Sequence, residues 1–343
     1  MIESPLREGN AIAMDRIEQL RSWVCDRLGA QPASIVPASE DASFRRYFRI
    51  SHAGGTLIAM DAPPPQENCA AFVHVAELFG RAGVNVPKIL AQDLERGFLL
   101  LTDFGATTYL QALPDKDAEH LYRDALQALV RIQMATTAGA LPEYDDALLR
   151  REVALFPDWY VARQLGQALE PAQRERLERV FDTLIAHNLA EPRVYVHRDY
   201  HSRNLMRTEP NPGILDFQDA VLGPLSYDLV SLLKDAYVEW PEERVIDWFV
   251  RYWEMARRAR LPVRTDFAEF YRDFEWMGVQ RHLKVLGIFA RLFHRDGKAR
   301  YLDDLPRVLR YLERAASRYR ELAPLARLLD ELHGRSARVM HTF

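Results

Sequence analysis

The apolar positions near the start of the chain recur with helical spacing. Ile17, Leu20 and Val24 are separated by three or four residues, so they fall on one side of a helix. Gly29 ends this pattern, and glycine commonly follows a helix because it adopts the left-handed backbone conformation without strain. The pattern therefore predicts a helix over residues 15–28.

Short runs of apolar and β-branched residues come next, each bounded by turn-forming residues, which is typical of β-strands. Between the third and fourth runs, residues 67–82 have the length and periodicity of a helix, and Gly83 ends it. We therefore expect a small lobe of five strands crossed by one helix. The five strand-like runs are 35–36, 47–50, 56–60, 86–90 and 98–101, with a hairpin turn at 51–55.

Beyond the fifth run the pattern is mainly helical, interrupted by apolar strand-like segments around 194–216. We expect an α+β fold of two lobes: residues 1–101 form a β lobe with a leading helix, 102–105 form a hinge, and 106–343 form a larger helical lobe. The predicted helices of the second lobe are 117–137, 147–166, 171–190, 225–260, 266–293 and 304–333.

Composition excludes several classes of protein. The chain has 343 residues, with 45 Lys and Arg against 49 Asp and Glu, so a net charge of −4 gives no general attraction to nucleic acid or anionic lipid. Its two cysteines, Cys25 and Cys69, lack the spacing of metal ligands and are typical of thiols in a reducing compartment. With no signal-like stretch and no run of 18 apolar residues, we expect a soluble cytoplasmic monomer.

The most informative segment runs from His197 to Asn204 and has the pattern His-x-Asp-x-x-x-x-Asn. Asp216 comes twelve positions later, at the end of an apolar run and before Phe217. Phosphoryl transfer requires such a set: one carboxylate orients the attacking hydroxyl, while an Asn and a second carboxylate hold Mg²⁺. The alternative, a polar surface loop, does not explain why apolar strands flank both parts. We therefore expect phosphoryl transfer assisted by Mg²⁺.

A second block continues the pattern: Asp216-Phe217-Gln218-Asp219-Ala220, then Gly223-Pro224, then Tyr227-Asp228-Leu229. Together these residues resemble the aminoglycoside phosphotransferase family, whose fold is similar to that of protein kinases, over residues 30–300. The resemblance implies that Asp199 is the catalytic base and that Asn204 and Asp216 are the metal ligands. It also implies structural roles for His197 and Asp228. Asp219 contacts substrate or is simply solvated, and the sequence does not decide between the two.

Within this superfamily, six stretches look most like the anomeric amino-sugar kinases of bacterial cell-wall recycling. That resemblance implies phosphorylation of the anomeric hydroxyl of N-acetylmuramate and N-acetylglucosamine. The alternatives are another hydroxyl acceptor (an aminoglycoside, choline or homoserine) or a nucleotide-binding pseudokinase. Intact Asp199, Asn204 and Asp216 argue against the pseudokinase. The six stretches are 42–49, 60–64, 101–105, 156–160, 216–220 and 276–284.

The phosphate-binding part departs from the family. The turn 39–43 contains no glycine, so Ser43 and nearby amides are left as donors, and Met60 stands where the family usually carries a lysine. Strand alternation places Arg46 with the apolar side chains of its strand, where an unpaired charge is costly. We expect Arg46 to replace the lysine and Glu67 to pair with it. The alternatives are a solvated edge-strand charge for Arg46 and a helix N-terminal carboxylate for Glu67.

The resemblance also indicates where ligands lie. The hinge should present backbone groups to the nucleobase, so Leu101 and Asp103 are candidate nucleotide-binding residues, for ATP or GTP. The candidate contacts with an amino-sugar substrate are two aromatic residues, which are as typical of a core, and two arginines, which are as typical of a solvated helix face. These substrate candidates are Trp159, Trp276, Arg203 and Arg281.

Overall fold

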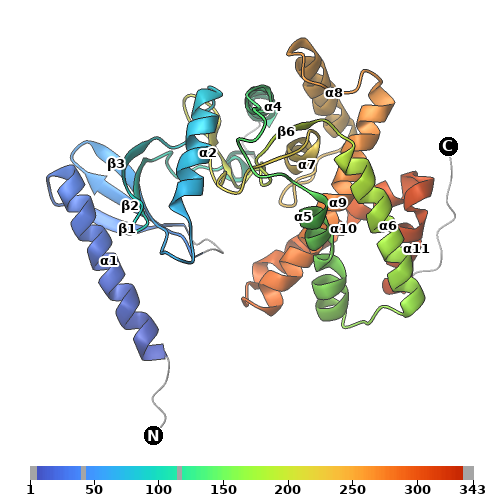
Figure 1. The fold of residues 1–343 in the computed structure, drawn as a ribbon, viewed down its shortest axis with the longest axis horizontal. Coiled ribbons are helices and arrows are strands. Elements are labelled where there is room, and N and C mark those ends of the chain that lie inside the picture. The colour runs from blue at the N-terminus through green and yellow to red at the C-terminus, as the bar shows by residue number, and fades with distance from the viewer. Residues whose placement is uncertain (1–5, 40–43, 114–117, 335–343) are drawn as a thin grey trace, which may run out of the picture.

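The structure is a computed structural model that describes residues 6–39, 44–113 and 118–334, with only the backbone of 6–15 and 39. A five-stranded antiparallel sheet with the order β1-β2-β3-β5-β4 forms one end of the molecule (Figure 1). Its strands are β1 (Ser34–Ser39), β2 (Arg46–His52), β3 (Gly55–Asp61), β4 (Ile89–Asp93) and β5 (Phe98–Thr102).

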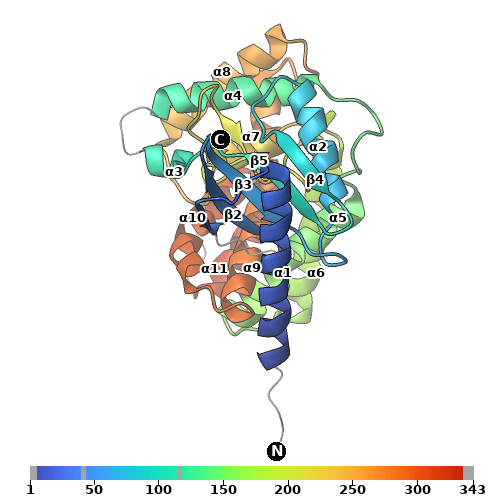
Figure 2. The ribbon, with the colours of Figure 1, turned by 90° about the vertical axis from the view of Figure 1, so that its left-hand side faces the viewer.

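Helix α1 (Leu6–Leu28) covers one face of this sheet, as Figure 2 shows. Leu20, Trp23 and Val24 are buried against Phe48, Ile50 and other residues that share their face. The apolar side of α1 packs against the apolar side of β2, because each element has a single apolar side to bury. This contact accounts for both the helical spacing of the apolar residues in α1 and the alternation in β2.

Helix α2 (Cys69–Arg81) covers the opposite face, between the sheet and the rest of the molecule. The Asn68 side chain accepts a hydrogen bond from the amide of Ala70 and caps the helix. Phe72 packs against Phe217 with 4.8 Å between ring centroids, so α2 links the sheet to the segment that carries Asp216.

The remainder is mainly helical with short strands: β6 (Arg193–Val196) pairs with β9 (Val221–Pro224), and β7 (Leu205–Met206) pairs with β8 (Gly213–Ile214). Strand β9 lies beyond the strand-like region expected around 194–216. The helices are α3 (Tyr109–Ala112), α4 (Ala118–Met134), α5 (Asp146–Val153), η2 (Phe156–Gln164), α6 (Pro171–Leu189), α7 (Tyr227–Leu233), α8 (Glu242–Arg258), α9 (Phe267–His294), η3 (Ala299–Asp304), α10 (Leu305–Arg318), η4 (Arg320–Leu322) and α11 (Ala323–Leu332).

The predicted fold class is confirmed, whereas several helix boundaries were wrong. The helix predicted over 147–166 is divided into α5 and the π-helical η2, which has Pro157 in its first turn. The helix predicted over 225–260 is divided at 234–241, where the Asp235 carboxylate accepts from the amide of Tyr237. Periodicity alone does not reveal such interruptions, because the apolar residues on either side keep a helical spacing.

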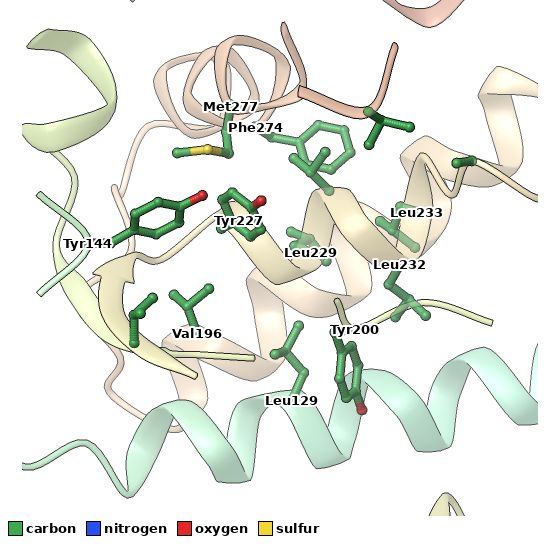
Figure 3. Packing of buried hydrophobic residues seen from close by; sticks show 14 of the residues in the cluster. Leu129, Tyr144, Val196, Tyr200, Tyr227, Leu229, Leu232, Leu233, Phe274 and Met277 are labelled. Atoms are coloured by element: carbon green, nitrogen blue, oxygen red, sulfur yellow. The ribbon is translucent and has the colours of Figure 1, made fainter. Parts of the chain in front are cut away.

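Helix α9 runs through the centre of the helical part and packs against α7, η2, α6 and α10. Figure 3 shows Phe274 and Met277 of α9 beside Tyr227 and Leu229 of α7 in this core. The core therefore supports α7 directly, and α7 begins beside the segment that carries Asp199. Within the described ranges, no helix has both the length and the apolar character needed to cross a bilayer.

Helix α9 approaches η2 very closely at Gly287. A Cβ atom built there would lie 2.4 Å from the carbonyl oxygen of Leu155, just before η2. Because the obstacle is backbone, Gly287→Ala must force the two helices apart. We expect this overpacking to lower the free energy of unfolding by about 1–3 kcal/mol, measured by urea titration.

Gly80→Ala in α2 is the matched control, because nothing lies within 4 Å of a Cβ atom at that position. Replacing a helical glycine without a clash should stabilise the protein by about 0.5–1 kcal/mol. If Gly287→Ala is as harmless as Gly80→Ala, the packing of α9 against η2 is looser than this distance implies.

Candidate active site

The segment after β6 is held by a buried carboxylate at the start of α7. Asp228 accepts hydrogen bonds from the amides of His197, at 2.6 Å, and Arg198, at 3.0 Å. The buried His197 ring is 2.9 Å from the carbonyl oxygen of Leu215, which joins this segment to the end of β8. His197 and Asp228 therefore make the structural contacts that the sequence suggested for them, and their roles remain predictions.

The far end of the same segment is held by a second carboxylate. The amide of Ser202 donates to Asp235, just beyond α7, at 2.9 Å. Arg198 has φ of 78°, and its guanidinium forms an ion pair with the buried Glu152 at 2.5 Å. The left-handed conformation of a non-glycine residue is strained, and it is maintained here because the neighbouring amides and the side chain are all bound.

Asp199 lies between these fixed ends, and its side chain is 42% exposed. Partial removal from water would by itself raise the pKa of Asp199, but the positive charges of Lys284 and Arg281 outweigh this effect and hold that pKa well below its usual range. The Arg281 guanidinium is 3.7 Å from the Asp199 carboxylate and donates to the carbonyl oxygen of Arg198 at 2.9 Å. Asp199 is therefore a carboxylate at neutral pH, able to accept a hydrogen bond from a hydroxyl.

Asn204 and Asp216 bring two oxygen-bearing side chains together beside Asp199. The Asn204 amide nitrogen donates to Asp216 at 3.2 Å and to the carbonyl oxygen of Asp199 at 2.9 Å. Asp216 has φ of 62°, which re-aims its side chain just after β8, and Gln218 donates to it at 2.8 Å. One carboxylate and one carboxamide oxygen on a cleft wall fit Mg²⁺, which prefers few protein ligands and keeps water and phosphate oxygens.

A cleft of about 500 Å³ opens between the sheet and the helical part, and Asn204 and Asp216 line it. Its apolar lining includes side chains from β3, β5 and α2, and other lining side chains are aromatic or basic. Its lining includes Tyr47, Arg49, Ile58, Leu101, Asp103, His201, Arg203, Met206, Tyr237, Arg300 and Tyr301.

The end of β5 and the connector after it contribute both predicted residues, Leu101 and Asp103, to the cleft. Asp103 binds Arg49 of β2 through contacts of 2.6 and 3.1 Å and also accepts from the amide of Gly105. Burial opposes the ionisation of Asp103, but these partners keep its pKa below the usual value. Sequence reasoning missed Arg49, although its place two residues from Tyr47 on the same face of the strand was visible.

The prediction that Arg46 enters the cleft was wrong. Arg46 forms an ion pair with Asp61, which also binds Arg16 of α1, and its side chain lies near Phe48 on the face that α1 covers. The alternation was correct, but the apolar side of β2 faces α1 rather than the cleft. The apolar stripe of the leading helix was the signal that this face would be covered.

Glu67 pairs with Arg45 instead of Arg46. The two charged groups are 2.7 Å apart, and the side chains are 10% and 11% exposed. Glu67 also accepts from the amide of Phe44 at 3.2 Å.

Met60 is fully buried in the core on the cleft side of the sheet. Ser43 lies outside the described residues.

Two of the four substrate candidates lie in the core. Trp276 is buried, with 4.4 Å between the centroids of its ring and the His187 ring. Trp159 is partly buried and packs on the same core. The expectation that Trp276 stacks on a sugar is therefore corrected. Arg281 is also buried, beneath the loop that carries Asp199. Among these candidates only Arg203 is one of the described residues that line the cleft.

Comparison with known proteins is consistent with this geometry. Residues 34–264 match the phosphotransferase enzyme family, APH. The chain belongs to this family. It is therefore a phosphotransferase, and the resemblance expected from the motif is confirmed.

Relatives of this phosphotransferase match it over most of its length. It is 54% identical to the N-acetylmuramate/N-acetylglucosamine kinase of Pseudomonas aeruginosa, over 92% of this chain and 97% of the relative. It is 50% identical to the protein of the same name from Neisseria meningitidis, over 94% of this chain and 97% of the relative.

Solved structures of distant phosphotransferases share the fold. The choline kinase LicA from Streptococcus pneumoniae superposes with a TM-score of 0.62 at 12% identity, over 88% of this chain and 99% of that chain. The ADP-bound aminoglycoside phosphotransferase APH(2'')-Ib gives a TM-score of 0.57 at 12% identity, over 85% of this chain and 97% of that chain. At such identities the likeness concerns the kinase-like fold alone.

The role of the two hydrogen bonds that Asp228 accepts from the amides of His197 and Arg198 can be tested by removing its carboxylate. Asp228→Ala leaves two buried amides without acceptors, each of which should cost roughly 1–3 kcal/mol of unfolding free energy. We expect urea titration to show this loss and turnover to fall with it. Asp219→Ala, which removes an exposed carboxylate nearby, is the control. Equal stability of the two variants would contradict a supporting role for Asp228.

Proposed function

We propose that this protein is an ATP-dependent kinase that phosphorylates the anomeric hydroxyl of N-acetylmuramate and N-acetylglucosamine, in the recycling of peptidoglycan. The observation that carries the phosphotransfer chemistry is the contact of Asn204 with both Asp199 and Asp216, with Asn204 and Asp216 lining the cleft. The choice of acceptor is supported by relatives of that name that are at least 50% identical over nearly the whole chain.

Asp199 orients the attacking hydroxyl and accepts its proton as the hydroxyl oxygen bonds to the γ-phosphorus of ATP and the bond from that phosphorus to the β–γ bridging oxygen breaks, which releases ADP. The anomeric hydroxyl is part of a hemiacetal and is more acidic than an ordinary alcohol. A modest base such as the Asp199 carboxylate is therefore sufficient for this acceptor.

Asn204 and Asp216 would hold Mg²⁺ beside Asp199. When bound, the ion neutralises charge on the phosphate oxygens. Gln218 fixes one oxygen of Asp216, and Asn204 fixes the other, so the carboxylate is oriented in advance. The intact set argues against a pseudokinase, which needs no such arrangement.

The nucleotide would lie against the apolar wall of the cleft, formed in part by Ile58, Leu101 and Met206. Residues 102–105 would act as the hinge between the two lobes, 1–101 and 106–343. We infer that Arg45, held by Glu67, supplies the positive charge that Met60 lacks. Because the reaction consumes ATP, we place the enzyme in the cytoplasm, and we propose that it works as a monomer.

The decisive experiment is to incubate the protein with Mg-ATP and a panel of hydroxyl acceptors and to locate the phosphate by ³¹P and ¹³C NMR. We expect both amino sugars to give products phosphorylated at C1. Choline, homoserine and an aminoglycoside should give none. Phosphate on the 6-hydroxyl, or activity only on an amino alcohol, would overturn the proposed function.

Asp199→Asn should lower kcat by about 10² or more, since a positioned general base contributes about 10²–10⁴. The neutral amide keeps the size of the side chain but cannot take a proton. Calorimetric titration should show that Mg-ATP still binds. Turnover close to that of the unmodified enzyme would remove Asp199 from the mechanism.

Arg45 and Arg46 form a matched pair, since they are consecutive arginines at the start of β2 that bind different carboxylates. Arg45→Ala should raise the KM for ATP by about tenfold, the equivalent of one charge-assisted hydrogen bond of about 1.5 kcal/mol, while Arg46→Ala should chiefly loosen α1. Steady-state kinetics with ATP as the varied substrate measures this. The reverse order of effects would return the role to Arg46.

A further inference from the structure

The cleft lining next to Asn204 in the sequence includes a guanidinium supported by aromatic rings. The Arg203 guanidinium carbon is 3.8 Å from the centre of the Tyr237 ring and 5.7 Å from that of Tyr301. All three residues line the cleft, together with His201 and Arg300. Rings at this distance hold the face of the guanidinium and leave its N–H groups, which lie in its plane, for a planar anion.

Arg203 differs from Arg49, another arginine that lines the cleft, in its charge environment. Arg49 is occupied by Asp103 and by the carbonyl oxygen of Gly105. Within the described part of the chain, no carboxylate forms an ion pair with Arg203. A positive charge that lines a cleft without a carboxylate partner suggests that the ligand provides one.

The positions of Arg203 and Tyr237 are fixed relative to Asp199. Asp235 accepts one hydrogen bond from the amide of Ser202 and another from the amide of Tyr237, both at 2.9 Å. The same carboxylate therefore ties the ring under Arg203 to the segment that carries Asp199. Because Arg203 follows Asp199 by four residues in this segment, an acceptor whose hydroxyl reaches Asp199 would lie close to Arg203.

The two proposed acceptors differ by one charged group. N-acetylmuramate is N-acetylglucosamine with a lactyl ether on O3, and its carboxylate is ionised at neutral pH. In the cleft this carboxylate would meet Asp199, Asp216 and the nucleotide phosphates, all negative. A nearby cation is needed to offset that repulsion, whereas the neutral sugar has no such requirement.

We propose that Arg203, held on Tyr237, binds the lactyl carboxylate of N-acetylmuramate and so distinguishes the acidic sugar from the neutral one. This inference rests on the proposed function and names the group that recognises the acidic acceptor. Arg281 and Lys284 are poorer candidates because both are buried and already bound. Arg281 donates to the carbonyl oxygen of Arg198, and Lys284 forms an ion pair with the Glu152 carboxylate.

The test compares the two sugars in variants of one residue. Arg203→Met keeps most of the length of the side chain and removes its charge, and Arg203→Lys keeps the charge but loses the planar pair of donors. We expect Arg203→Met to lower the ratio of kcat/KM for N-acetylmuramate to that for N-acetylglucosamine by about 10- to 100-fold, with partial recovery in Arg203→Lys.

The neutral amide of N-acetylmuramate provides an independent arm, because it alters the ligand instead of the protein. The unmodified enzyme should prefer the acid to the amide, and Arg203→Met should lose that preference. Arg300→Met is the matched control, since Arg300 is a second arginine that lines the cleft and lies over the Tyr301 ring. If Arg300→Met moves the ratio and Arg203→Met does not, the inference is wrong.

Two further outcomes would overturn the inference without affecting the proposed function. An equal loss of kcat/KM with both sugars would mean that Arg203 does not bind the lactyl carboxylate. A rise confined to the KM for ATP would mean that Arg203 binds the nucleotide. Failure of the unmodified enzyme to phosphorylate either sugar at C1 would overturn the proposed function itself. Thermal unfolding of Arg203→Met identifies a loss that comes from misfolding, in which case Arg203→Lys decides.

Discussion

The whole site depends on two carboxylates at the two ends of one short helix. Asp228, at the start of α7, binds the amides of His197 and Arg198, and Asp235, just after its end, binds the amide of Ser202. A flexible loop would otherwise carry Asp199. Because α7 is packed in the core, the packing of helices far from the cleft determines the position of the loop (Figure 3). The core therefore determines how precisely the segment that carries Asp199 is positioned.

Charge beneath the loop completes this arrangement. Arg198, Arg281 and Lys284 bring three positive charges against the carboxylates of Glu152 and Asp199. Burying such a group costs several kcal/mol unless each member is hydrogen-bonded. The members also bind a backbone carbonyl and the Tyr227 hydroxyl, and the positive charges of Lys284 and Arg281 keep Asp199 ionised. Stability and charge state of the site are therefore coupled.

Much of the fold and the catalytic set could be predicted from sequence because the information is local. Asp199, Asn204 and Asp216 lie within one short segment, and the strands of the small lobe have clear apolar runs. Side-chain pairs between distant elements could not be predicted in the same way. Arg49 meets Asp103 across 54 positions, and Arg45 meets Glu67 from the other side of the β2–β3 hairpin. The alternation in β2 identified the side of Arg46 correctly but did not say which layer would cover that side.

The replacement of lysine by Met60 has a consequence for the chemical reactivity of the cleft. Its cationic lining residues, Arg49, Arg203 and Arg300, are arginines, which stay protonated in proteins. Reagents that acylate a nucleophilic amine, including nucleotide analogues that deliver an acyl group to the usual kinase lysine, find no amine among these residues. Dicarbonyl reagents that condense with guanidinium groups would find several. Chemical profiling of this protein should therefore be built around guanidinium chemistry.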